Sequence, residues 1–261
     1  MPLSSGRKIA LSLPRRFVGD LVRCAQSLPL MTVERRMGLA AVADARQNAL
    51  GRPGWCALFT RAFALVASRW PELRRAYIPY PRPHLYEHPV SVASVAVARP
   101  VGEEEGVFFV HLRTPESQDV RAIDSYLRRC KERPLEDVAM FRRVLQTSGW
   151  PLPLRRLLWW YTTRFSGFVR ARHLGTFGVS VVSNFGATSP HLLTPVTSAL
   201  NYGIVAPDGS VDVYLTFDQR VLTAGSAARA LEETERELKG ILLQELASGG
   251  RQSPKSASSG D

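Results

Sequence analysis

The stretch that decides the fold reads Leu215-Thr216-Phe217-Asp218-Gln219-Arg220-Val221-Leu222-Thr223-Ala224-Gly225. Its first residues are apolar, β-branched or aromatic, which predicts a strand that ends at the polar residues 218–220. Ser226 is a plausible N-cap for the helix that follows. The leucines beyond it keep helical spacing. They are Leu231, Leu238, Leu242 and Leu246. A strand end therefore runs directly into the closing helix.

Earlier in the chain, Gly175-Thr176-Phe177-Gly178-Val179-Ser180-Val181-Val182-Ser183-Asn184-Phe185-Gly186 forms the second informative segment. Residues 176–182 predict a strand, and the small and polar residues after it predict a turn. Two further strands are expected at 200–206 and 211–217. Pro207-Asp208-Gly209-Ser210 joins them as a hairpin turn.

The rest of the chain alternates predicted helices with a predicted β-hairpin. We expect two helical stretches over 15–49, broken near Pro29, and a buried helix over 55–70. The proline-rich segment 77–89 is expected to be irregular. Strands are predicted at 90–98 and 107–112, and a mostly helical stretch at 119–145, interrupted at Pro134. These elements predict one α/β domain over residues 1–247, with a Ser/Gly-rich tail at 248–261 that we expect to be disordered.

Composition narrows the classes of function. The chain has 261 residues, a net charge of +11 and three cysteines, Cys24, Cys56 and Cys130, which form no Cys-x-x-Cys pair. Neither a disulfide framework nor a metal site is indicated, and a reducing cytoplasm fits best. The positive charge suits a polyanionic ligand, a membrane surface or nucleic acid, but it also suits solvated arginine-rich helix faces. Because no zinc-finger spacing and no aromatic RNP-like strand accompanies the charge, we do not expect a nucleic-acid partner.

Residues 154–169 are unusual, because Leu157-Leu158-Trp159-Trp160-Tyr161 is flanked by arginines. No Asp or Glu occurs between Arg142 and Arg172. Such a segment could lie on a membrane surface or on a partner. A core helix with basic ends is the interpretation that we favour at this point.

The two informative segments together resemble the catalytic core of the 2-oxo acid dehydrogenase acyltransferases (dihydrolipoamide acyltransferases), relatives of chloramphenicol acetyltransferase. That family ends in a strand reading Phe-Asp-His-Arg-Val-x-Asp-Gly, followed by Ala-Ala-Arg in a helix. Here the same frame reads Phe217-Asp218-Gln219-Arg220-Val221-Leu222-Thr223-Ala224, then Ala227-Ala228-Arg229. The family's turn after the neighbouring strand matches Ser183-Asn184-Phe185-Gly186. The order of segments matches from about residue 10 to 246.

The resemblance implies a chloramphenicol acetyltransferase-like fold, a two-layer sandwich with a mixed β-sheet. It also implies a homotrimer, or a multiple of trimers, with active sites between subunits that receive CoA and a thiol. By the same resemblance, Ser183 would hydrogen-bond the tetrahedral oxyanion, and Asn184, Gly186 and Arg220 would contact CoA. No Asp-Lys hairpin tip and no Ala/Pro-rich linker precedes the core, so we expect no lipoyl domain and a free-standing core.

The sequence departs from the family at the two positions that carry its chemistry. Gln219 stands at the histidine position, and a side-chain amide cannot take a proton near neutral pH. Thr223 replaces the aspartate and removes its charge. None of His84, His88, His111, His173 and His191 has an aspartate four residues later. His191 is the nearest to the Ser183 turn in sequence, yet a surface or interface role is expected for it.

Three hypotheses follow. The first is a CoA-dependent acyltransferase-like enzyme, slow or with a different base. The second is a non-catalytic relative that binds acyl-CoA or serves as a scaffold. The third is a peripheral membrane protein that uses residues 154–169, which we consider the least favoured of the three.

Overall fold

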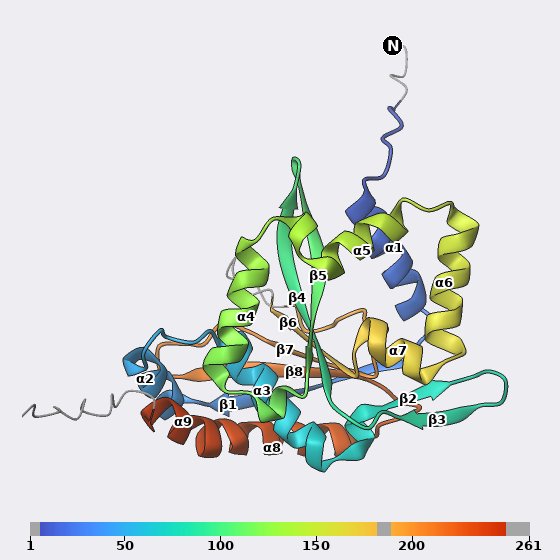
Figure 1. Cartoon of the computed structure of the whole chain (residues 1–261). Coiled ribbons are helices and arrows are strands. Elements are labelled where there is room, and N and C mark those ends of the chain that lie inside the picture. Colours follow the sequence, from blue (N-terminus) through green and yellow to red (C-terminus); the bar gives the residue numbers. More distant parts are fainter. Residues whose placement is uncertain (1–5, 182–188, 249–261) are drawn as a thin grey trace, which may run out of the picture.

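The computed structural model of the chain describes residues 6–181 and 189–248. Its centre is a mixed six-stranded sheet in the order β1-β8-β7-β6-β4-β5, and a separate two-stranded ribbon, β2-β3, projects to one side (Figure 1). β4, β6 and β7 run parallel to one another, whereas β1, β5 and β8 are antiparallel to their neighbours. The predicted mixed sheet and α/β class are confirmed. The strands are β1 (Leu30–Gly38), β2 (Arg75–Ile78), β3 (His84–Glu87), β4 (Val92–Val101), β5 (Glu104–Arg113), β6 (Phe177–Val181), β7 (Ser198–Tyr202) and β8 (Ser210–Asp218).

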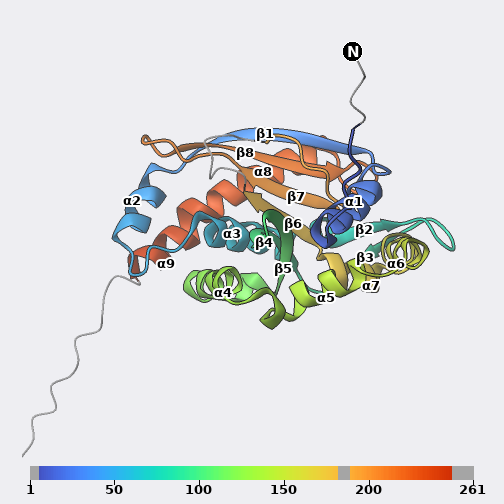
Figure 2. The same ribbon diagram turned by 90° about the horizontal axis from the view of Figure 1, so that it is seen from above.

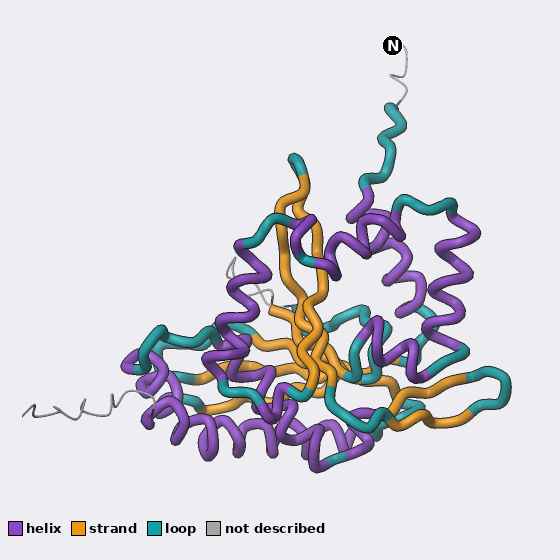
Figure 3. The backbone as a smooth tube through the Cα atoms, viewed as in Figure 1, coloured by secondary structure: helices purple, strands orange, loops and turns teal. Residues whose placement is uncertain are grey.

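Helices cover both faces of the sheet, as the view from above shows (Figure 2). The smooth trace in Figure 3 separates the strands of the sheet from the helices around them. The helices are α1 (Leu13–Ala25), α2 (Ala40–Asn48), α3 (Trp55–Arg69), α4 (Val120–Glu132), α5 (Ala139–Ser148), α6 (Leu152–Arg164), α7 (Gly167–Leu174), α8 (Ala224–Glu237) and α9 (Leu243–Ser248). Short 3₁₀ turns lie at Pro71–Arg74, Pro115–Ser117 and Leu135–Asp137, and a π-helical turn at Leu238–Leu242 joins α8 to α9.

The main core lies between α3 and the sheet. Alternate residues of the strands point to this side, and α3 is apolar on nearly every side because it packs against the sheet, α4 and α8. The rings of Phe59 and Tyr202 stack with centroids 4.3 Å apart, and those of Phe63 and Phe177 meet edge to face at 4.9 Å. Buried aromatic pairs of this kind stabilise a core beyond the area that they bury.

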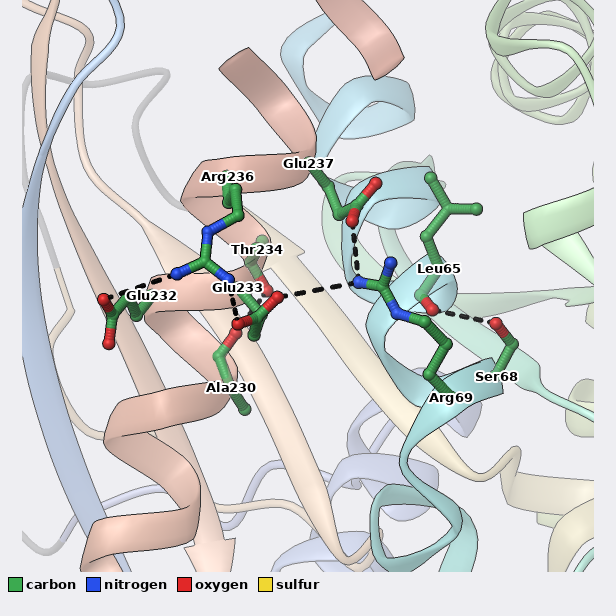
Figure 4. A network of polar contacts seen from close by, with 9 residues as sticks. All are labelled: Leu65, Ser68, Arg69, Ala230, Glu232, Glu233, Thr234, Arg236 and Glu237. Carbon is green, nitrogen blue, oxygen red and sulfur yellow. Dashed lines mark hydrogen bonds and ion pairs between the residues drawn. The ribbon is translucent and has the colours of Figure 1, made fainter. Parts of the chain in front are cut away.

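Ion pairs join the outer ends of α3 and α8 (Figure 4). The guanidinium of Arg69 lies 2.6 Å from the Glu237 carboxylate and 3.8 Å from that of Glu233. Arg236 pairs with Glu232 and Glu233 one turn away on the same helix. This network fixes α8 against α3, and α8 begins at the end of β8 where the candidate site lies.

Most of the predicted elements are confirmed, with changes at their ends. The helix at 55–70, the hairpin of β4 and β5, and the helical stretch interrupted at Pro134 are all present. The Pro207–Ser210 turn joins β7 to β8 through hydrogen bonds between Ala206 and Ser210 and between Gly209 and Ala206. Ser248, placed in the tail by the sequence, ends α9. Residues 249–261 lie outside the described residues.

Two predictions about the first half of the chain are wrong. The second expected helix of 15–49 is in part a strand, because residues 30–38 form β1 and pair along their whole length with β8. The segment 77–89 is not irregular throughout, since β2 and β3 form a ribbon there. His88, at the end of this segment, is buried, and its ring centroid lies 6.3 Å from that of Phe168.

The expectation that residues 154–169 form a core helix is also wrong. α6 forms, but one side of it is exposed, with Leu154 at 52 % and Leu157 at 60 % accessible. Within the described ranges, the model contains no helix that is both long enough and apolar enough to span a bilayer.

Candidate functional site

The turn after β8 is held by an ion pair within the turn itself. The carboxylate of Asp218 is fully buried and accepts from the Arg220 backbone N–H at 3.0 Å, from Nε at 2.9 Å and from Nη2 at 2.6 Å. The backbone carbonyl of Asp218 accepts from the N–H groups of Val221 and Leu222. These contacts fix the path of the chain from the strand into α8.

Two further groups complete this arrangement. The Arg220 guanidinium lies over the ring of Tyr77, 4.3 Å from its centroid, in cation–π geometry. Arg170 of α7 is buried and donates to the backbone carbonyls of Tyr77 at 3.1 Å and Pro195 at 2.7 Å. Burial lowers the pKa of Arg170 to about 10, and the nearby Asp218 carboxylate opposes that shift. Arg220, predicted to contact CoA, is therefore engaged with Asp218 and Tyr77.

Gln219 lies at the surface between these anchored neighbours. Its backbone N–H donates to the Pro29 carbonyl at 3.1 Å, and its side-chain amide donates to the sulfur of Met31. Both contacts come from the start of β1, the edge strand of the sheet. Neither partner is basic, so the contacts position the amide without giving it proton-accepting chemistry.

Thr223 is the N-cap of α8. Its hydroxyl oxygen accepts from the Ser226 backbone N–H at 3.1 Å, which satisfies a donor of the first helical turn. The sequence predicted Ser226 for this role, and the helix instead begins at Ala224. Thr223 thus has a capping role in this structure.

Three of the predicted site residues, Ser183, Asn184 and Gly186, lie outside the described residues. On the far side of that gap, His191 is exposed, and its Nδ1 lies 3.1 Å from the hydroxyl of Thr32. Thr32 in turn lies 2.9 Å from the hydroxyl of Thr216 on β8. His191 therefore sits at the β1–β8 edge.

A cavity of about 750 Å³ lies on the face of the sheet opposite to α3. Its lining residues come from β4, β5 and β6 and from α1, α5, α6 and α7. Figure 1 labels these elements. Most of its wall is apolar. The apolar residues include Phe17, Leu21, Phe109, Met140, Val144, Leu158, Trp159, Leu174 and Val196. A cavity of this size and polarity is typical of a small-molecule site.

A few polar groups enter the cavity. His111 of β5 and His173 of α7 both line it, together with Arg143 and Arg172. Burial lowers the pKa of His111 to about 4, and the neighbouring His173 acts in the same direction. The His111 imidazole is therefore neutral near pH 7. It is a hydrogen-bonding group there, not a cation.

A buried ion pair between α1 and α6 also lines the cavity. Arg155 lies 3.3 Å from the Asp20 carboxylate of α1 and donates to the Ser148 carbonyl at 3.1 Å. Burial raises the pKa of Asp20, and Arg155 opposes that shift. The pair joins α1 to α6 in the wall of the cavity.

The cavity and the Asp218 turn are neighbours but separate. Pro195 lines the cavity and also accepts from Arg170, whereas the described cavity wall contains none of residues 215–225. Sequence reasoning missed the cavity because its wall comes from segments between residues 17 and 196. The alternation of Phe109 and His111 on one side of a predicted strand was the one local signal.

The cysteines do not supply a reactive thiolate in the described structure. Burial raises the pKa of Cys24 and of Cys56 to about 11, and it also raises that of Cys130. The thiolate is the nucleophilic form, so these thiols are inert near neutral pH.

Comparison with known proteins supports the fold. No protein-family model matches the chain, and no curated protein sequence matches it. Among solved structures, the chain is similar to the cubic core of the pyruvate dehydrogenase multienzyme complex (TM-score 0.65, 15 % identity, 92 % of this chain and 94 % of that one). It is also similar to a dihydrolipoamide acetyltransferase of Azotobacter vinelandii, with a TM-score of 0.64 and 14 % identity over 92 % of this chain and 94 % of that one. A third similar structure is that of a probable dihydrolipoamide acetyltransferase of Listeria monocytogenes, with a TM-score of 0.62 and 15 % identity over 90 % of this chain and 95 % of that one. The predicted resemblance in fold is thus confirmed, over nearly the full length of both chains.

Proposed function

We propose that this protein is a CoA-dependent acyltransferase-like protein that works without a histidine base, so that it transfers acyl groups to or from a thiol slowly. The observation that carries the proposal is the β8 turn. Asp218 and Arg220 form the ion pair of an intact turn, while Gln219 between them presents an amide. We take this turn as the frame of the site, with an amide in place of the proton acceptor.

The chemistry open to such a site is attack by a thiolate that forms without help from the protein. The thiolate sulfur attacks the thioester carbonyl carbon, the tetrahedral intermediate collapses, and the departing thiolate takes a proton from water. A free thiol near pH 7 is a few per cent thiolate, so this step proceeds without a base. A positioned general base contributes about 10²–10⁴-fold, and the rate should be lower by that factor.

Ser183 is our proposed oxyanion donor, with Asn184 and Gly186 beside it as CoA contacts. We also propose assembly as a homotrimer or a multiple of trimers. The similarity to the cubic core of a dehydrogenase complex supports such an assembly. Arg220 would contribute to CoA binding through the part of its side chain, 30 % exposed, that faces solvent.

A second candidate function is acyl-CoA binding without turnover. The cavity favours it, because its apolar walls can hold an acyl chain whether or not a base is present. In that case the positions of Gln219 and Thr223 serve only the structure of the turn and of α8.

The deciding experiment measures acyl-CoA consumption by the purified protein with a thiol acceptor, in parallel with CoA binding. Gln219→His tests the base, and Gln219→Asn, which keeps an amide, is its matched control. We expect slow wild-type turnover, a gain of about tenfold or more in Gln219→His and none in Gln219→Asn. CoA binding without turnover in any variant would favour the second candidate. Wild-type turnover at ordinary enzymatic rates would refute the proposal, and so would the absence of CoA binding by the wild type and both variants.

A further inference from the structure

The side of α6 that faces away from the cavity carries an exposed cluster of large apolar side chains. We call this cluster the aromatic face, and it also includes Tyr80 of the loop between β2 and β3, Phe165 directly after α6 and Phe168 of α7. Each of the residues in the cluster is between 40 and 60 % accessible. Its members are Tyr80, Leu154, Leu157, Trp160, Tyr161, Phe165 and Phe168.

The aromatic face is not needed to hold α6 on the domain. The inner side of the helix already does so, with Trp159 6.0 Å from the ring of Phe17, Arg155 paired with Asp20, and Thr162 buried. Leu154, Leu157 and Tyr161 follow helical spacing on the outer side. Large contiguous apolar patches on a folded domain mark interaction sites.

Contacts among the rings give the aromatic face a fixed shape. The rings of Tyr161 and Phe165 stack at 5.4 Å, and Trp160 lies 6.1 Å from Phe165. Tyr80 lies 5.7 Å from Trp160, and its backbone N–H donates to the Arg164 carbonyl at 3.2 Å. These contacts join the loop of the β2–β3 ribbon to α6, and Figure 1 shows the two elements at the same side of the molecule.

The charged side chains of α6 and of the loop between β2 and β3 are all arginines. Arg156 is exposed on α6, Arg164 is half-buried at its end, and Arg82 is exposed at the tip of the ribbon. The sequence from 142 to 172 contains no acidic residue, and Asp20, the carboxylate beneath α6, is neutralised by Arg155.

We propose that the aromatic face docks this protein on an anionic membrane surface. Tyrosine and tryptophan rings favour the boundary between headgroups and acyl chains, and arginine side chains reach from there to lipid phosphates. A second copy of the chain is a poorer occupant, because a twofold contact would place arginine against arginine. This reverses the preference for a core helix that the sequence suggested.

Vesicle co-sedimentation tests the proposal, with phosphatidylcholine vesicles compared with vesicles that also contain about one third phosphatidylserine. The full chain should bind the anionic vesicles, lose binding as salt rises to about 0.5 M, and bind the neutral vesicles weakly. The triple variant Leu157→Ser/Tyr161→Ser/Phe165→Ser should lose binding. Its matched control is Leu50→Ser/Ile204→Ser/Ile241→Ser, which removes three exposed apolar side chains elsewhere and should bind as the wild type does.

A charge variant separates lipid binding from general stickiness. Arg156→Glu should weaken binding about tenfold or more, since each positive charge near an anionic surface contributes about fivefold. Arg229→Glu, at an exposed position on α8, should have little effect.

Three results would overturn the proposal. In the first, the full chain fails to sediment with anionic vesicles. In the second, the triple variant binds these vesicles as well as the wild type does. In the third, the wild type binds no vesicles and the triple substitution converts an oligomer to a monomer. The last would make the aromatic face an interface between copies of the chain. Sedimentation equilibrium without lipid monitors it.

Discussion

Arg220 donates from its backbone N–H, Nε and Nη2 to the carboxylate of Asp218, two residues before it in the chain, and its guanidinium also covers the ring of Tyr77. Arg170, fully buried behind the turn, adds a second positive charge near the same carboxylate. One buried anion therefore fixes Arg220 and the turn that leads from β8 toward α8, and it lies near a second, buried arginine.

Removal of the Asp218 charge should be strongly destabilising. Asp218→Asn removes the charge of the buried carboxylate that pairs with Arg220 and lies near the buried Arg170, and loss of one partner of such an ion pair costs up to about 3–5 kcal/mol of unfolding free energy. Urea unfolding measures the change. Asp212→Asn, on the same strand and half-buried, is the control and should cost less than about 1 kcal/mol. Equal effects of the two substitutions would show that the turn does not depend on the ion pair.

The cap at Thr223 can be separated from any catalytic role. Thr223→Ala removes the acceptor for the Ser226 N–H and should cost about 1 kcal/mol of unfolding free energy. Thr223→Asp should retain stability, because aspartate is a good N-cap and its charge favours the start of a helix. Thermal or urea unfolding of the two variants checks this. A loss in Thr223→Asp as large as in Thr223→Ala would contradict the capping role.

Stability should fall as the pH decreases from about 6.5 to about 4. His111 has a folded-state pKa lowered to about 4, so between these values the unfolded chain binds a proton that the folded chain does not. The contribution of His111 to the free energy of unfolding is fully present above about pH 6.5. It is lost as the pH falls toward about 4, by up to about 3 kcal/mol. Urea midpoints across this range, compared with His111→Gln, isolate the effect, since glutamine does not titrate. An unchanged pH dependence in the variant would exclude His111 as its source.

The cavity should bind apolar ligands. A fluorescent fatty-acid probe should bind the wild type and quench Trp159 fluorescence, because that residue lines the cavity. Val144→Trp fills part of the space and should weaken binding about tenfold. Ile204→Trp places the same ring on the surface and should have no effect. Equal binding by both variants would place the probe elsewhere.

The sequence predicted the strand and helix around Gln219 because hydrophobic alternation and helical leucine spacing are local signals. It missed β1, where Glu34, Arg35 and Arg36 interrupt the apolar pattern of an edge strand. The pairing of β1 with β8 and the bond from Arg35 to Glu235 of α8 at 2.8 Å decide the conformation there. Such tertiary contacts override local propensity.

The sequence also identified the helix at 154–169 but not its exposure. Apolar residues occur on both the inner and the outer side of α6, so periodicity cannot separate the side that faces Phe17 from the side that faces solvent. The cavity was beyond reach for a different reason. Phe17, His111 and His173 come together only through the fold.

The pH dependence of acyl transfer tests the central claim most directly. If the amide of Gln219 takes no proton, wild-type turnover follows ionisation of the acceptor thiol, whose pKa is about 8.5, and log rate should rise by about one for each pH unit from 6 to 8. Gln219→His should add a plateau above the imidazole pKa. A wild-type profile that already levels off near pH 6.5 would reveal a histidine base and contradict the account.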